Sequence, residues 1–351
     1  MLARVLVLTT LAHAPTLAQE VWVSNTNAGS ISVVDTATLG VVQTFAVGAQ
    51  PARLAFSSDG ARAFVPLLGA DALVEVDAGS RTVLRTIATV DQPNAVVLLP
   101  GARAYVAGAN GVVGIVDLAA GQATGTIVLG APAAGYSVSG LALSPDGAKA
   151  YATWGDLAEI DTQSDTLSRS LFAGVSPAGL ALTSDGTKAY VSATFGYPSF
   201  SFYGSVVVVD VASFTVTGSI FTWALPSQIT LNRAGTEAHV STPSTWVDTG
   251  YGAGYLPSPW VARLDLATGG LDGGTNAGAV AGGHALSSDE ARLFVAVAPH
   301  DALKVIERAS DTVLATIPVG DGPTQVVLRP NPAPGQSVKG GRASVPTSRR
   351  P

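Results

Sequence analysis

SPDGAKAYATW, at residues 144–154, is one of several near-copies of a single pattern in this chain. The others read SSDGARAFVPL at 57–67, TSDGTKAYVSA at 183–193 and SSDEARLFVAV at 287–297. An Asp-Gly pair between two alternating apolar segments is typical of a hairpin, because Asp accepts backbone N–H bonds and Gly adopts positive φ angles. The repetition therefore predicts one β unit that recurs along the sequence.

A second marker, an apolar segment that ends in an acid, gives the number of units. It occurs seven times, at Asp35, Asp77, Asp117, Asp161, Asp210, Asp265 and Glu307. Most units begin with Pro and an apolar segment, such as PNAVVL at 93–98, and continue through the Asp-Gly turn to two further segments of strand length. Four strands of about six residues with turns of about four need roughly forty residues, which is the spacing of the markers.

The two ends of the repeat region complement each other. Residues 21–48 contain strands two to four of a unit but no first strand, whereas residues 323–330, PTQVVLRP, supply a first strand with nothing after it. Joining the two ends removes two exposed sheet edges. The sequence therefore predicts an all-β, seven-bladed β-propeller of four-stranded antiparallel blades over residues 19–330, closed by a C-terminal strand that completes the first blade.

The units resemble those of the YVTN-type β-propeller family. Its characteristic strand reads AYVA at 104–107, AYVS at 189–192 and VWVSN at 21–25, and the resemblance covers about residues 21–330. It implies the propeller fold but no single activity, because such repeats occur in bacterial and archaeal surface proteins, in accessory subunits of periplasmic redox enzymes and in propellers that hydrolyse lactones.

The two termini lie outside the repeats. Residues 1–18 combine Arg4, an apolar run and small residues before Ala14 and Ala18, which is typical of a secretory signal peptide cleaved after one of these two alanines. Residues 331–351 form a basic Pro/Gly/Ser tail that we expect to be disordered. We therefore expect a secreted or periplasmic protein, and no other stretch is apolar for long enough to predict a membrane span.

The composition argues against several functions. The chain has no Cys, which removes disulfides, thiolate nucleophiles and Cys-ligated metals. The net charge of the chain is −6. Because the tail is positively charged, the repeat region by itself is more negative than the whole chain, which argues against nucleic acid as a partner. The histidines at 239, 284 and 300 lack metal-site spacing, and no serine-nucleophile motif or phosphate loop is present. The sequence thus predicts no metal, no cofactor and no assignable catalytic residue.

The seven recurrent acids have a structural interpretation. Each follows an apolar strand and precedes a short polar stretch, as in DTATLG at 35–40. An Asp at such a place accepts hydrogen bonds from the backbone N–H groups two and three residues on. We therefore interpret the acids as turn formers, one per blade, and not as a metal or catalytic cluster.

Insertions in blades five and six are the first candidate binding region. They lie between the second and third strands, at residues 194–205 and 242–260, and therefore on the face that also carries the links between blades. Exposed aromatic rings among Gly, Ser and Pro favour recognition, although such rings also pack on one another to stabilise long loops. The candidate ligand-binding residues are Phe195, Tyr197, Phe200, Phe202, Tyr203, Trp246, Tyr251, Tyr255 and Trp260.

The mouth of the central channel is the second candidate. The third residue of each first strand is expected to face it, and long polar groups there suit either a polar ligand or water. The candidates are Arg53, Asn94, Gln228, Gln325, His284 and His300.

Our leading hypothesis from the sequence is a non-catalytic binding scaffold. It would recognise an envelope or extracellular protein, peptide or glycan through the aromatic loops of blades five and six. The alternatives are a lactonase-like hydrolase, for which the channel mouth lacks a paired carboxylate, and an accessory propeller subunit of a periplasmic redox enzyme, for which a partner chain would carry the cofactor.

Overall fold

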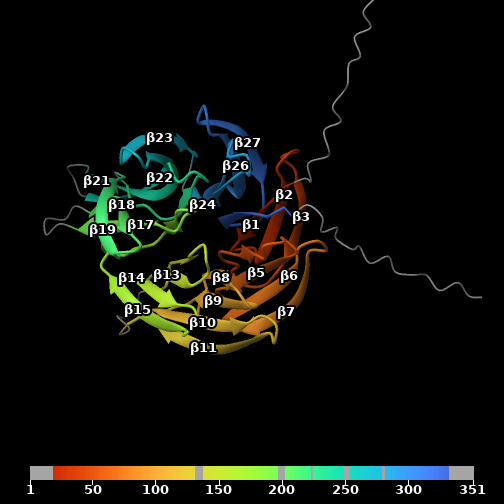
Figure 1. Cartoon of the computed structure of the whole chain (residues 1–351). Coiled ribbons are helices and arrows are strands. Elements are labelled where there is room, and N and C mark those ends of the chain that lie inside the picture. The colour runs from red at the N-terminus through yellow and green to blue at the C-terminus, as the bar shows by residue number, and fades with distance from the viewer. Residues whose placement is uncertain are drawn as a thin grey trace, which may run out of the picture.

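The computed structural model of the chain is a ring of seven four-stranded sheets around a central axis (Figure 1). It describes residues 19–130, 137–196, 202–222, 224–248, 253–278 and 281–331. The seven-bladed, all-β prediction is confirmed. Within these ranges the one helix is the 3₁₀ turn η1 (Ala298–His300), and no helix is long and apolar enough to cross a membrane.

Every blade is an antiparallel meander that runs outward from the axis. Blade one holds β28 (Pro323–Leu328), β1 (Glu20–Asn25), β2 (Ser30–Asp35) and β3 (Val41–Ala46). Blade two holds β4 (Ala55–Phe56), β5 (Arg62–Leu67), β6 (Ala72–Asp77) and β7 (Thr82–Ala88). Blade three holds β8 (Ala95–Leu99), β9 (Arg103–Ala107), β10 (Val112–Asp117) and β11 (Gln122–Val128). Blade four holds β12 (Gly140–Leu143), β13 (Lys149–Thr153), β14 (Leu157–Asp161) and β15 (Thr166–Leu171).

The last three blades follow the same plan. Blade five holds β16 (Leu180–Leu182), β17 (Lys188–Gly196), β18 (Phe202–Asp210) and β19 (Thr215–Phe221). Blade six holds β20 (Ile229–Leu231), β21 (Glu237–Asp248), β22 (Ala253–Asp265) and β23 (Gly270–Asn276). Blade seven holds β24 (Ala281–Leu286), β25 (Arg292–Val297), β26 (Ala302–Glu307) and β27 (Thr312–Pro318).

The ring closes through blade one. Strand β28, from the far end of the repeat region, pairs antiparallel with β1, with Trp22 opposite Val327 and Val23 opposite Val326. Val326 is 3% exposed, so this pairing buries an apolar side chain as well as sheet edges. The predicted completion of the first blade by a C-terminal strand is therefore observed.

The core lies between neighbouring blades. Second and third strands are buried along most of their length because their apolar side chains pack on the sheets at either side, whereas the fourth strands are mostly exposed at the rim. Between blades one and two, the ring of Trp22 meets those of Phe45 and Phe56 edge-on, with centroids 5.4 and 5.0 Å apart. Edge-to-face stacking of this kind adds to the stabilisation that burial itself provides.

Strand direction alternates in a blade, so the ring has two distinct faces. We call one of them the lower face: it carries the turns between strands one and two and those between strands three and four. The upper face carries the connections between strands two and three and the links between blades. On the lower face, the six recurrent aspartates accept backbone N–H groups in turns as predicted, whereas Glu307 accepts the hydroxyl of Ser310 instead. Asp35 Oδ1, for example, accepts the N–H groups of Ala37 and Thr38 at 2.9 and 2.7 Å.

The insertions of blades five and six differ from the expected loops, because the strands continue through much of them. Strands β17 and β18 stay paired out to Gly196 and Phe202, and β21 and β22 out to Asp248 and Ala253. The second strand of blade six, β21, has 12 residues, and the third strand, β22, has 13. The second strands of blades one to four and of blade seven have only five or six residues. At about 3.3 Å per residue, the blade-six hairpin extends roughly 20 Å further from the upper face than the hairpin of blade seven does.

Candidate functional site

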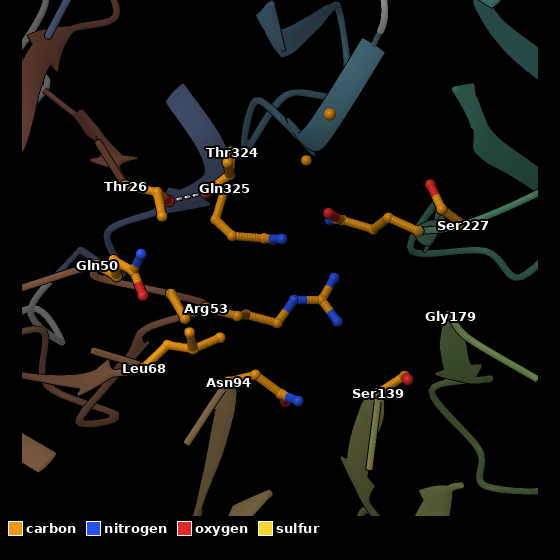
Figure 2. A pocket seen from close by; sticks show the side chains of 14 residues that line it. Thr26, Gln50, Arg53, Leu68, Asn94, Ser139, Gly179, Ser227, Thr324 and Gln325 are labelled. Carbon is orange, nitrogen blue, oxygen red and sulfur yellow. Dashed lines mark hydrogen bonds between the residues drawn. The ribbon is translucent and has the colours of Figure 1, made fainter. Parts of the chain in front are cut away.

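A cavity of about 380 Å³ lies at the upper mouth of the central channel, and residues from all seven blades line it (Figure 2). Its walls come from the first residues of the inner strands and from the connections just before them. Figure 2 shows Arg53 and Gln325 reaching from adjacent blades towards the middle, with Asn94, Ser139 and Ser227 around them. The lining residues are Thr26, Gln50, Ala52, Arg53, Leu68, Asn94, Ser139, Gly179, Ser227, Gln228, Gly282, Gly283, Thr324 and Gln325.

Glycines at the inner strands set how closely the blades approach the axis. A Cβ on Gly179 would lie 1.9 Å from the carbonyl oxygen of Ser227, and one on Gly283 would lie 2.7 Å from the Cα of Gln325. No side chain fits at such distances, so these positions require glycine. The bare backbone there leaves the channel mouth to the long side chains of the other blades.

Arg53 is the most unusual of the lining residues. Its guanidinium has no ion pair and no hydrogen bond to the described residues, although its backbone N–H donates to Asn94 O at 3.1 Å. Protein surrounds the side chain, and its accessible part faces the cavity. This burial lowers the pKa of Arg53 from its ordinary value, because a desolvated cation without a counter-charge is unfavourable.

Three amide side chains around Arg53 are also incompletely bonded. Asn94 Nδ2 donates to Val138 O at 2.7 Å, and Gln228 Nε2 donates to His284 O at 2.9 Å. The oxygens Asn94 Oδ1, Gln228 Oε1 and Gln325 Oε1 are buried and have no hydrogen-bond partner among the described residues. The channel mouth therefore combines one cation with three acceptors that lack a donor.

Two of the predicted channel residues lie elsewhere. His284 is 1% exposed and does not line the cavity, although the preceding residue in β24, Gly283, does. Its Nδ1 lies 2.7 Å from Ser241 Oγ and its Nε2 lies 3.0 Å from His239 O. Burial lowers the pKa of His284 to about 3, so the ring is neutral at pH 7.

His300, the other residue, is exposed on η1 at the upper face, outside the cavity. The carboxylate of the adjacent Asp301 accepts the N–H of Gly322 at 2.9 Å and thereby helps to hold the link to β28. His239, which the sequence placed in a strand where other units have Tyr or Phe, is 3% exposed within β21.

The aromatic candidates lie mostly at the limit of the described structure. Tyr197, Phe200 and Tyr251 fall outside the described residues. The backbone pairing of the hairpins places Phe195 opposite Tyr203, Gly196 opposite Phe202 and Trp246 opposite Tyr255. Trp260 is 46% exposed at the upper end of β22, which makes it the aromatic candidate whose exposure is established.

Among the described residues, the cavity is lined mainly by uncharged polar side chains and by glycine backbone. Of the described residues that line it, Arg53 alone is ionisable, so the lining supplies neither a carboxylate nor an imidazole for proton transfer. The described part of the chain also holds no group of three His, Asp or Glu residues placed to ligate a metal. The hydroxyl of Ser241 contacts an imidazole, but both side chains are fully buried and out of reach of a substrate.

Several lining residues were missed by the sequence reasoning, which considered the third residue of each first strand and Asn94 alone. Ser139, Ser227 and Thr324 each directly precede the residue that the repeat alignment placed third in a first segment, and they also line the cavity. Thr26 Oγ1 lies 2.5 Å from Thr324 Oγ1 and donates to Pro51 O at 3.0 Å, so it joins the link before β4 to the closing strand. Aligning the second as well as the third position of the repeats identifies most of this set.

The fold and the cavity together define a seven-bladed β-propeller with a small polar site at one mouth of its channel. Residues 3–203 match the family of YNCE-like β-propellers, and the chain belongs to this family. This match does not test the resemblance to YVTN-type repeats, which stays a prediction. No curated protein sequence matches the chain.

Solved structures with the same fold come from proteins of different kinds. The structure of hydrazine synthase from Kuenenia stuttgartiensis is 22% identical, covers 80% of this chain and 90% of that chain, and gives a TM-score of 0.67. A protein of unknown function from Desulfotomaculum acetoxidans is 17% identical over 90% of this chain and 100% of that one, with a TM-score of 0.70. A putative 6-phosphogluconolactonase from Bacteroides uniformis is 16% identical over 89% and 99%, with a TM-score of 0.68. At these identities the likeness is one of fold.

Proposed function

We propose that this propeller is a non-catalytic binding protein, secreted or periplasmic, that recognises a protein, peptide or glycan on its upper face. One observation carries the proposal: Arg53 is the single ionisable side chain among the described residues that line the cavity. A hydrolytic or acid–base site needs at least one group that accepts or donates a proton near pH 7. A guanidinium and neutral amides bind ligands but do not transfer protons.

The extended hairpins support the same face as the recognition surface. They extend from the upper face, which also carries the links between blades and the cavity. Trp260 exposes an aromatic ring where the blade-six hairpin begins, and Trp246 and Tyr255 pair further out along its backbone. Long hairpins with aromatic residues on a rigid scaffold are typical of recognition.

Trimming the blade-six hairpin tests this proposal. Thr242 and Trp260 are paired, so replacing residues 243–259 by Asn-Gly leaves a two-residue hairpin on an intact blade. We expect the variant to unfold at the same temperature as the parent and to lose the envelope component that the parent retains on an affinity column. Arg233→Gln, in the lower-face turn of blade six, is the control and keeps the partner. Retention of the same partner by the trimmed variant would contradict the proposal.

A hydrolase is the alternative class, and the likeness to a putative 6-phosphogluconolactonase is its support. We expect purified protein, with and without divalent metal, to leave a panel of lactones unchanged above the buffer rate. Turnover that disappears in Arg53→Gln would overturn the non-catalytic assignment.

An accessory role in a redox enzyme is a special case of the proposed binding function. The fold is shared with a structure of hydrazine synthase, and in such a role a partner chain would carry the cofactor. The visible absorption spectrum of the captured partner distinguishes this case, because a bound redox cofactor absorbs where this chain alone does not.

A further inference from the structure

We propose that the channel mouth is a carboxylate site anchored by Arg53, and that its ligand is a small hydroxycarboxylate with one negative charge. The inference goes beyond the proposed function, since it adds a small-molecule site at the channel mouth to a face proposed to bind a protein, peptide or glycan. It stands on the bonding state of the four polar side chains at the mouth, Arg53, Asn94, Gln228 and Gln325.

Arg53 differs from every other arginine that the structure describes. The others form an ion pair or at least donate a hydrogen bond: Arg292 to Thr36 O at 2.7 Å and Arg233 to Ser288 O at 3.2 Å, for instance. Arg53 does neither, although it lies inside the ring and has lost much of its water. A guanidinium presents five N–H donors in a planar fork that matches a carboxylate with two parallel bonds. An anion from outside the chain is the partner that its surroundings lack.

The amide oxygens indicate what else the ligand carries. The orientations of Asn94 and Gln228 are set by their N–H donation to Val138 O and His284 O, which leaves Asn94 Oδ1 and Gln228 Oε1 as the unpaired atoms. Gln325 Oε1 is the third. An acceptor that has lost its water without gaining a donor is unfavourable. Hydroxyl groups next to the carboxylate are donors of the kind that these oxygens lack.

Charge balance favours a monoanion. Arg53 contributes one positive charge, and the other described residues of the lining contribute none. One carboxylate neutralises this charge, whereas a phosphate monoester carries about −1.5 to −2 at pH 7 and would bring its oxygens against amide oxygens that need donors. A free amino acid would place its ammonium beside Arg53 in a poorly hydrated channel, where like charges repel strongly.

The size and the rim of the cavity fit a small polar molecule. Its volume of about 380 Å³ is at the lower end of the range for ligand pockets. Hydroxyl groups of Thr26, Ser139 and Ser227 lie around the mouth, and glycine backbone at Gly179 and Gly283 leaves room beside them. The guanidinium of Arg53 and these hydroxyl groups line the same cavity, so one small ligand is able to reach both.

Three probes with the same three-carbon skeleton separate these contributions by isothermal titration calorimetry on the full mature chain. Glycerate carries the carboxylate and two hydroxyls, glycerol the hydroxyls alone, and propionate the carboxylate alone. We expect saturable binding of glycerate at pH 7 and at least tenfold weaker binding of each of the other two. Inorganic phosphate is the fourth probe and is expected to bind more weakly than glycerate.

Substitution of Arg53 provides the second arm. Arg53→Gln should weaken glycerate binding by about 30-fold or more, because a partly desolvated charge pair is lost. Arg53→Lys keeps the charge but not the planar fork, so at least a tenfold loss is expected, and it serves as the test if the glutamine variant does not fold. Arg233→Gln removes the same charge on the lower face and should bind as the parent does.

Equal binding by Arg53→Gln and the parent would overturn the inference. So would tighter binding of phosphate than of glycerate, or no saturable binding of glycerate at all. If glycerate binding shows one of these results but hairpin trimming still abolishes capture of the partner, the carboxylate site is wrong and the proposed function stands. The two proposals are therefore tested separately.

Discussion

The lower and upper faces of the ring differ in whether their polar side chains have bonding partners. On the lower face, a groove of about 640 Å³ is lined by residues of blades two, three and four. It contains charged side chains, and these have bonding partners. Arg62 pairs with Asp77 and Glu75 there, and Asp146 accepts the hydroxyl of Ser144 at 2.6 Å. At the upper mouth, Arg53 and three amide oxygens have no partner among the residues that the structure describes.

The difference teaches where to look for function in a repeat protein. The lower-face turns recur from blade to blade because each sheet needs them, and their bonds are complete within the chain. The upper mouth breaks the repeat, since blades contribute Arg, Gln, Ser or Gly at equivalent places. Polar groups that a fold leaves unsatisfied reduce stability and are retained where binding uses them.

The largest effect is expected from opening the ring, because both faces depend on closure. A chain that ends at Gly322 lacks β28 and leaves the edge of β1 unpaired. We expect it to lose the cooperative thermal transition in circular dichroism and to aggregate. A chain that ends at Asn331 is the control and should melt as the full chain does. A normal melt for the shorter chain would mean that β28 does not close the ring.

The second effect concerns the buried His284 beneath the mouth. Its pKa is about 3 in the folded chain and about 6.5 when unfolded, so below pH 6.5 the unfolded chain takes up a proton that the folded one does not. The free energy of unfolding therefore decreases as pH falls, by about 2 kcal/mol at pH 5 from this group. His284→Asn should remove that part of the decrease in urea titrations at pH 7.5 and pH 5.

The exposed His300 supplies the matched control. His300→Asn should retain the pH dependence of the parent, because its ring is in contact with solvent. An unchanged pH dependence in His284→Asn would show that the buried imidazole is not the group responsible.

The third effect tests the lower face alone. Asp35 accepts two backbone N–H bonds, and the bond from Thr38 is the main reason that the pKa of Asp35 is lowered. Asp35→Ala should reduce the free energy of unfolding at pH 7 by about 1 kcal/mol, since the carboxylate is partly exposed. Asp35→Asn keeps an acceptor oxygen and should lose less. Equal losses in the two variants would mean that the turn does not rely on the acceptor.

Much of the fold followed from the sequence because its determinants are local and repeated. Asp-Gly turns, a terminal acid on each third strand and an orphan first strand at 323–330 fix the number of blades and the closure. The extended hairpins were expected as loops, because Gly, Pro and Ser at 242–260 hide the strand pairing that Thr245, Trp246 and Val247 maintain.

The site was only partly predictable. Arg53, Gln228 and Gln325 followed from their place in the repeat, but the absence of a partner for Arg53 depends on the packing of all seven blades. His284 was expected at the channel mouth, but Gly283 lines the cavity there and the imidazole is buried beside Ser241. Strand β24 has a register shift at this point, so regular alternation along the strand does not give the direction of the side chain.

The smallest effect is the most direct test of the contrast between the faces. If Arg53 is held without a partner for a ligand, Arg53→Gln should raise the free energy of unfolding of the protein by itself, by about 0.5 kcal/mol, because an unpaired desolvated charge is removed. Urea titration at pH 7, with Asp35→Ala alongside, measures the sign. Opposite signs for the two variants are the predicted result, and a loss of stability in Arg53→Gln would contradict the account by showing that Arg53 is bonded within the fold.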